Sequence, residues 1–232
     1  WWAPDDSRVA VERFDDAPVR TVTRTAIGAE NTETFTQRYP LAGTANSDVS
    51  LHVMNPDGSS RVAVDLGPDK DIYVPRVDWA KDGKTLFVQR QNRDQTRLDL
   101  LAVDPATGIS RLLFSETAAE KSWINLGNDY RFLKDGSLDW WSERGGYGHL
   151  YLHRSNTHPD SRWIQLTKGD WVVAGLVGVD ETRGRVYFTG TKDDVLAQQV
   201  YALDLTSPGK IERLTELGWV NAASMDKDGK SL

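Results

Sequence analysis

An Asp-Gly or Asp-Asp turn recurs along this chain, each time after an apolar or aromatic stretch and before a short β-prone run. The copies are Asp5-Asp6, Asp82-Gly83, Asp135-Gly136 and Asp228-Gly229, with a degenerate fifth copy at 179–184. The glycines Gly83, Gly136, Gly184 and Gly229 follow one another at intervals of 53, 48 and 45 residues. A repeat of about 40–50 residues built from four strands is typical of the blades of a β-propeller.

Each repeat holds short runs of β-branched and aromatic residues between turn residues, which is the pattern of an all-β chain. No stretch of ten or more residues has the apolar spacing of a helix. We therefore predict an all-β fold, a β-propeller segment of about four four-stranded blades plus partial strands at both ends. Residues 1–232 would all belong to one partial propeller domain, with blades at approximately 1–66, 72–116, 120–167 and 171–216 and a further blade starting at 219–232.

The first repeat is longer than the others, because Gly83 follows Asp6 by 77 residues. The extra residues fall at 17–46, where two β-prone runs, 19–25 and 34–39, flank a turn-like segment. This pattern predicts a hairpin arm that leaves the first blade. Strands outside a sheet expose unpaired backbone groups, so such an arm is expected to pair with a partner. The alternative is a disordered surface loop.

The composition is that of a globular domain and excludes several functions. The net charge is −6 and the basic residues are scattered among acidic ones, whereas a nucleic-acid groove needs a basic stripe. No apolar run approaches the roughly 18 residues of a membrane-spanning helix. Cys is absent, which excludes disulfides and thiolate chemistry. Calcium loops and phosphate-binding glycine loops are also missing, so we expect no metal and no cofactor.

The ends of the chain suggest a piece of a longer protein, because it starts with Trp1-Trp2 and stops where another strand is expected. A propeller hides its edge strands by closing on itself. One hypothesis is that the run 219–225 supplies a strand beside 8–14 and closes a four-bladed ring. The alternatives are that two copies complete one another or that the edges stay exposed.

Candidate catalytic groups are few. Ser142 follows Trp141 and Trp140, whereas a nucleophile elbow needs a small residue close before the serine, so we expect a strand-end hydroxyl. Paired carboxylates for glycoside hydrolysis could come from Asp15, Asp16, Asp139 and Glu143. Most Asp residues here lie beside turn residues, where the side chain caps backbone N–H groups, so this remains a distant alternative.

The four His residues do not suggest a metal site. His149 and His153 lie four residues apart in an expected strand, which places them roughly 13 Å apart on one face. His52 and His158 have no companion in the sequence. We expect structural or surface roles for all four.

Several motifs resemble the dipeptidyl peptidase IV family, in order and over the whole chain. Trp-Trp-Ala-Pro-Asp-Asp-Ser-Arg-Val-Ala at 1–10 is similar to a blade opening of that family, and Gln-Arg-Tyr-Pro-Leu-Ala-Gly-Thr-Ala-Asn at 37–46 to its Arg-Tyr-Pro-x-Ala-Gly-x-x-Asn motif. Glu-Arg-Gly-Gly-Tyr-Gly-His-Leu-Tyr at 143–151 resembles its Gly-Tyr-x-His-hydrophobic-Tyr strand entry. Leu-Thr-Lys-Gly-Asp-Trp-Val-Val at 166–173 resembles its Thr-Lys-Gly-x-Trp-x-Val segment.

The resemblance implies part of a propeller that caps an α/β-hydrolase domain in a serine exopeptidase. Such enzymes release N-terminal dipeptides with Pro or Ala at the second position. Their catalytic groups lie in the hydrolase domain, so no catalytic residue is expected here, and their paired Glu residues for the substrate ammonium would precede Trp1. The implied partners are a peptide with a free N-terminus and a C-terminal hydrolase domain of the same polypeptide. The family suggests a periplasmic, secreted or membrane-associated location, which the sequence itself leaves unknown.

Two sets of site residues follow from the resemblance. The stretch 121–128 corresponds to a family loop that faces the substrate and gives the candidates Trp123, Asn125 and Asn128. The family's basic and aromatic residues after Trp123 are missing, and the alternative is that Trp123 is a core residue. The arm corresponds to the extension that pairs protomers in family homodimers. Its candidate interface residues are Val19, Thr21, Thr23, Phe35, Arg38 and Tyr39. The alternative function is a stand-alone propeller that binds proteins or peptides.

Overall fold

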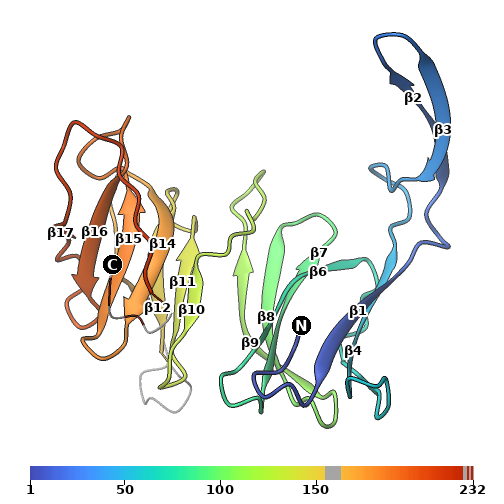
Figure 1. The fold of residues 1–232 in the computed structure, drawn as a ribbon, viewed down its shortest axis with the longest axis horizontal. Helices are drawn as coiled ribbons and strands as arrows, with labels where there is room; N and C mark the ends of the chain where they lie inside the picture. The colour runs from blue at the N-terminus through green and yellow to red at the C-terminus, as the bar shows by residue number, and fades with distance from the viewer. Residues whose placement is uncertain (155–162, 227–228, 230, 232) are drawn as a thin grey trace. The chain divides into compact units, whose positions relative to one another are not determined.

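The computed structural model describes residues 1–154, 163–226, 229 and 231 (Figure 1). Every regular element among them is a β-strand and all strand pairs are antiparallel, which confirms the all-β class. None of these residues belongs to a helix that could cross a membrane. The chain divides into two compact units, Trp1–Ile124 (unit 1) and Asn125–Leu232 (unit 2).

The first sheet of unit 1 has the order β1 (Val9–Asp15), β4 (Asp48–Met54) and β5 (Val62–Ala63). The start of the chain extends this sheet at its free edge, where Trp2 bridges Val9 and the Ala10 N–H donates to the Trp1 carbonyl at 2.8 Å. Residues 219–225 form no strand, and the Asn221 N–H donates instead to the Gln198 carbonyl within unit 2. The strand predicted at 219–225 is therefore absent from the described structure.

The long first repeat contains a separate hairpin. β2 (Thr21–Ile27) pairs with β3 (Thr32–Arg38) and with no other strand in the described part of the chain. The two strands join the sheet of β1 and β4 at their base (Figure 1). These two strands, β2 and β3, form the arm. At the base, the Arg38 guanidinium donates to the carbonyls of Ala17 and Val19, at 3.1 and 2.6 Å.

The second sheet of unit 1 is a four-stranded meander. Its strands are β6 (Ile72–Trp79), β7 (Leu86–Asn92), β8 (Arg97–Val103) and β9 (Ser110–Thr117). These four strands lie within residues 72–117. Alternation puts Leu86, Val88 and Leu101 on the face that packs against Leu51 and Val53 of the first sheet.

Unit 2 contains two further four-stranded meanders. The first is β10 (Tyr130–Phe132), β11 (Leu138–Ser142), β12 (His149–His153) and β13 (Trp163–Gln165). The second is β14 (Val173–Asp180), β15 (Arg185–Gly190), β16 (Gln199–Asp204) and β17 (Glu212–Arg213). We call these the D sheet and the E sheet. A core of side chains such as Leu150, Leu152, Val186, Phe188 and Tyr201 fills the space between them.

The recurring turns share one local mechanism. In each, the Asp carboxylate accepts a hydrogen bond from the backbone N–H two residues later, which is an Asx turn. The pairs are Asp5 with Ser7, Asp82 with Lys84, Asp135 with Ser137 and Asp180 with Thr182, at 2.8–3.1 Å. Gly83, Gly136 and Gly184 follow with φ of 68°, 82° and 64°. Asp228 of the last copy lies outside the described residues.

Candidate functional site

The loop that precedes the D sheet carries the predicted substrate-binding residues. Trp123 is 64% exposed, so it is not a core residue of the described structure. Its neighbour Ile124 is buried, and the Ile124 N–H donates to the Gln95 carbonyl at 2.8 Å. Trp123 belongs to unit 1, whereas Asn125 and Asn128 belong to unit 2.

Within unit 2, the Asn125 side chain contacts Glu143, which the sequence offered as a candidate carboxylate for glycoside hydrolysis. The Asn125 side-chain amide donates to the Glu143 carboxylate at 2.6 Å, across 18 positions of sequence. Both residues are exposed, as is Asn128. Asp129 holds the end of this loop, because its carboxylate accepts the Leu176 N–H at 2.7 Å. Asn125 and Glu143 thus form an exposed polar pair. Asn125 lies in the loop before β10, and Glu143 directly follows β11.

Ser142 is the last residue of β11, and its hydroxyl makes local hydrogen bonds. It is 2% exposed, and its hydroxyl oxygen lies 3.1 Å from the Arg144 backbone nitrogen and 3.0 Å from Arg144 Nε, both of which donate to it. The Arg144 guanidinium in turn lies over the rings of Tyr151 and Trp163, at 4.7 and 4.2 Å from their centroids. The serine oxygen therefore anchors an arginine that covers two aromatic rings.

The histidines of β12 make contacts within the D sheet and the chain that follows it. The His149 ring contacts the Thr167 hydroxyl at Nδ1 and the Gly169 carbonyl at Nε2, at 3.0 and 2.9 Å. A carbonyl can only accept, so Nε2 carries the proton and Nδ1 accepts from Thr167. Burial lowers the pKa of His149 and of His153, which keeps both rings neutral near pH 7.

No metal site emerges from these residues. His52 contacts Arg61 at the surface of unit 1, and His158 lies outside the described residues. Within the described part of the chain, no three His, Asp or Glu side chains are placed to hold a metal ion.

The candidate carboxylates are divided between the two units. Asp15 and Asp16 lie near the arm in unit 1, where Asp15 pairs with Arg13 and Asp16 accepts from the Ser47 hydroxyl. Asp139 is fully buried in the D sheet, and Glu143 is four positions further along the chain, a span of roughly 13 Å for extended backbone. Asp139 has the most unusual surroundings of the four.

The arm residues differ in availability. Thr21, Thr23, Phe35 and Tyr39 are exposed. Val19 is only 2% exposed, and the Arg38 guanidinium is engaged at the base. The first four can therefore meet a partner directly, whereas the Val19 side chain cannot.

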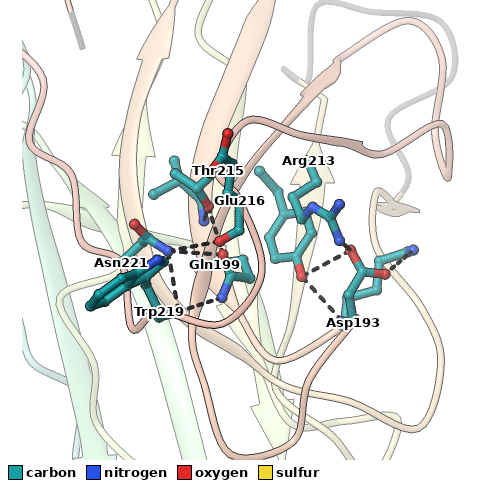
Figure 2. Close-up of polar contacts among 10 residues, drawn as sticks. Asp193, Gln199, Arg213, Thr215, Glu216, Trp219 and Asn221 are labelled. Atoms are coloured by element: carbon teal, nitrogen blue, oxygen red, sulfur yellow. Dashed lines mark hydrogen bonds and ion pairs between the residues drawn. The ribbon is translucent and has the colours of Figure 1, made fainter.

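A polar cluster in the E sheet was missed from the sequence. Figure 2 shows the Gln199 side chain, which is fully buried, between three neighbours. Its carbonyl oxygen accepts from Thr215 and Asn221 at 2.8 and 2.9 Å, and its amide donates to the Trp219 carbonyl at 2.7 Å. The cluster fixes the loop that follows β17. A single Gln within an apolar strand gives no sequence signal of this role.

Comparisons with known proteins agree with these observations. A family model described as the dipeptidyl peptidase IV (DPP IV) N-terminal region matches residues 1–232. Inactive dipeptidyl peptidase 10 of Rattus norvegicus is 27% identical over 87% of this chain and 27% of its own length. Dipeptidyl peptidase 4 of Trichophyton equinum is 26% identical over 88% of this chain and 27% of its own length.

A solved structure shares the fold. The crystal structure of Porphyromonas gingivalis dipeptidyl peptidase 4 matches with a TM-score of 0.78 and 28% identity, over 92% of this chain and 30% of that one. This match confirms the expected β-propeller segment. The chain spans less than a third of the length of each of these three proteins.

Proposed function

Because this chain belongs to the dipeptidyl peptidase IV family, as its N-terminal region, we propose that it is the non-catalytic propeller part of a serine exopeptidase that removes N-terminal dipeptides with Pro or Ala at the second position. The observation that carries this proposal is the family match over residues 1–232. The chemistry would reside in an α/β-hydrolase domain of the same polypeptide. The propeller would limit access and orient the peptide, which lowers the barrier by positioning.

The polar pair of Asn125 and Glu143 supports a contact with the peptide. Both side chains are exposed, and the amide holds the carboxylate in one place. A fixed carboxylate and amide can accept from and donate to peptide backbone groups at little further ordering cost. Asn128 lies on the same loop and would add a second amide.

The test uses the longer polypeptide that contains this segment. Asn125→Ala and Asn128→Ala are each expected to lower kcat/KM for Gly-Pro-p-nitroanilide by about 10-fold, which corresponds to the loss of one oriented hydrogen bond. Asn55→Ala is the control, because Asn55 is partly exposed in a turn of unit 1, where its amide contacts Ser59 and Ser60. Ser142→Ala should leave the rate unchanged.

The isolated chain gives the complementary result. It is expected to release no p-nitroaniline from the same substrate. Turnover that depends on Ser142 would refute the assignment of the chemistry to another domain. Unchanged kcat/KM in both Asn variants would refute the peptide contact and favour the alternative of a propeller that binds proteins or peptides by another surface.

We also propose that the arm pairs two copies of the chain. Of its 14 strand residues, 12 are exposed, and neither outer edge of the hairpin pairs with another strand among the described residues. Its two faces differ. One carries six threonines, and the other carries Arg24, Glu33 and Phe35, with the Arg24 guanidinium 4.4 Å from the Tyr39 ring centroid. A twofold interface requires a surface that complements itself, and a face with one cation and one anion beside an aromatic ring meets this requirement.

Deleting residues 22–37 and joining the ends with a Gly-Ser turn is expected to convert a dimer to a monomer in light scattering. The deletion spares Arg38 and its contacts at the base. Arg24→Glu and Glu33→Arg should each weaken the dimer, and the double swap should restore it. Thr25→Glu on the threonine face is the matched control, because Thr25 is exposed and is not a candidate interface residue. An unchanged mass after the deletion would refute pairing through the arm.

A further inference from the structure

Asp139 is the most anomalous group in the described structure. It is 0% exposed, and neither of its carboxylate oxygens has a hydrogen-bond partner among the described residues. A buried carboxylate normally has a cation or several donors beside it, because an unpaired charge in an apolar layer is strongly unfavourable. The position therefore calls for an explanation other than packing.

The register places Asp139 on the face of the D sheet that meets the E sheet. Its partner on β12 is Leu152, and Trp141 on the same face pairs with Leu150. These three hydrophobic residues belong to or pack against the core shared with the E sheet. The carboxyl is thus one polar group within an apolar layer between two sheets.

The charged groups around this layer do not neutralise Asp139. Its partner on β10 is Arg131, whose guanidinium instead donates to the Tyr130 carbonyl at 2.8 Å and is exposed. From the E sheet, the facing positions of β14, β15 and β16 are apolar, as the core members Leu176, Val186 and Leu203 show.

The charged side chains of the E sheet lie on its face away from the D sheet. Asp180 and Arg185 are paired with each other in register, one position beyond the apolar pair Val179 and Val186. Asp180 contacts Arg183, and Arg185 contacts Glu212. The histidines His149 and His153 also alternate away from Leu152 on β12.

A cleft lies next to the buried carboxyl. It has a volume of about 430 Å³, and Ser137, Leu152 and Leu205 form part of its lining. The charged residues at its wall are Lys134, Asp135, Arg154 and Glu181. Ser137 is two residues before Asp139 and lies on the same side of the chain. Leu152 is the cross-strand partner of Asp139. Directly opposed side chains in an antiparallel pair begin only about 5 Å apart. A small movement of Leu152 would let water from the cleft reach the carboxyl.

We propose that Asp139 makes the packing of the D sheet against the E sheet proton-dependent. When Asp139 is protonated, its neutral carboxyl is compatible with the apolar layer, and the D and E sheets stay packed together. With the proton lost to solvent, the carboxylate requires hydration, so the layer opens locally at the cleft and admits water. Unit 2 would therefore be tighter in mildly acidic than in mildly alkaline surroundings.

The direction of the effect follows from proton binding. Burial raises the pKa of Asp139 from 3.8 to about 7. The Trp140 N–H, which lies near the carboxyl without making a hydrogen bond of normal geometry, and the Arg131 charge oppose this only in part. Between these two pH values the folded chain keeps a proton that the unfolded chain has released, so stability falls as the pH rises and levels off above 7. From pH 5 to pH 8 the folding equilibrium constant should fall by roughly 100-fold through this group. His149 and His153 act oppositely, because protonating a buried neutral ring destabilises the fold at acid pH.

The experiment compares the wild type with Asp139→Asn and Asp139→Leu, neither of which can titrate. Urea unfolding at pH 5 and pH 8 should show a folding equilibrium constant that falls 100-fold more in the wild type than in either variant. The contribution of the histidines is the same in all three proteins and cancels in this comparison. Hydrogen exchange should report the local opening. At pH 8 the amides of β11 and β12 should exchange at least 10-fold faster in the wild type than in Asp139→Asn, and at pH 5 equally fast. β7 and β8 of unit 1 serve as the internal control.

Two results would overturn the proposal. If the wild type and both variants change in parallel between pH 5 and pH 8, Asp139 does not carry the proton. If the extra exchange at pH 8 is equally strong in β7 and β8, the group acts on global stability and not on the contact between the D and E sheets. Should Asp139→Asn fail to fold, Asp139→Leu makes the same comparison without an unpaired amide.

Discussion

Replacing Trp171 with alanine is expected to lower the free energy of unfolding of unit 2 by roughly 3–5 kcal/mol. The Trp171 ring is 8% exposed and stacks 6.3 Å from the Phe188 ring, and its edge meets the His149 ring at 5.0 Å. Its indole N–H donates to the Lys168 carbonyl at 2.9 Å. The substitution would remove a large buried ring and leave a polar carbonyl without its donor.

The surroundings of Trp171 cannot collapse to fill the space. Carbon atoms added at Gly169 and Gly190 would lie 2.6 and 3.1 Å from the indole, so the chain is shaped around this ring. The measurement is urea unfolding followed by circular dichroism. Trp171→Phe should recover much of the loss. Trp219→Ala is the matched control, because its side chain is 73% exposed and Gln199 holds only its backbone carbonyl. A similar loss in both alanine variants would contradict the argument.

The turns and the strands near them could be predicted from sequence, because the signals are local. An Asp followed by Gly supplies both an acceptor for the N–H two residues later and a residue that tolerates positive φ. The bonds at Asp82 and Asp135 show that each copy uses both properties. The spacing of these turns then sets the length of every repeat and hence the number of sheets.

Properties that depend on distant neighbours could not be predicted. The run 219–225 has the composition of a strand, but a strand also needs a free edge. Within unit 2, the Asn221 N–H instead donates to the Gln198 carbonyl, and Met225 lies against Gly178. Composition alone therefore predicted a strand that the described structure does not contain.

The candidate site shows the same limit. The contact between Asn125 and Glu143 joins the entrance to β10 with the exit of β11, and neither residue signals the other in sequence. The burial of Asp139 is equally non-local. Within Leu-Asp-Trp-Trp-Ser the strand alternates between two covered faces, so the sequence does not reveal that the Asp points into an apolar layer.

A second large effect is expected at a glycine that joins the two sheets of unit 1. Gly108 has a φ of +76°, and a carbon atom added there would lie 1.9 Å from the Ala63 carbonyl oxygen of β5. Its own carbonyl accepts the Asp65 N–H at 2.9 Å, so the turn between β8 and β9 is fastened to the chain just after β5.

Gly108→Ala is therefore expected to lower the free energy of unfolding of unit 1 by roughly 3 kcal/mol or more, because backbone strain and overpacking add. The control is Gly58→Ala, at a φ of +85° with nothing within 4 Å of the added carbon, where only the strain of about 1 kcal/mol applies. The difference between the two variants in urea unfolding isolates the close approach of the sheets. Equal losses would show that the turn of Gly108 can move away from β5, and that this contact does not hold the two sheets together.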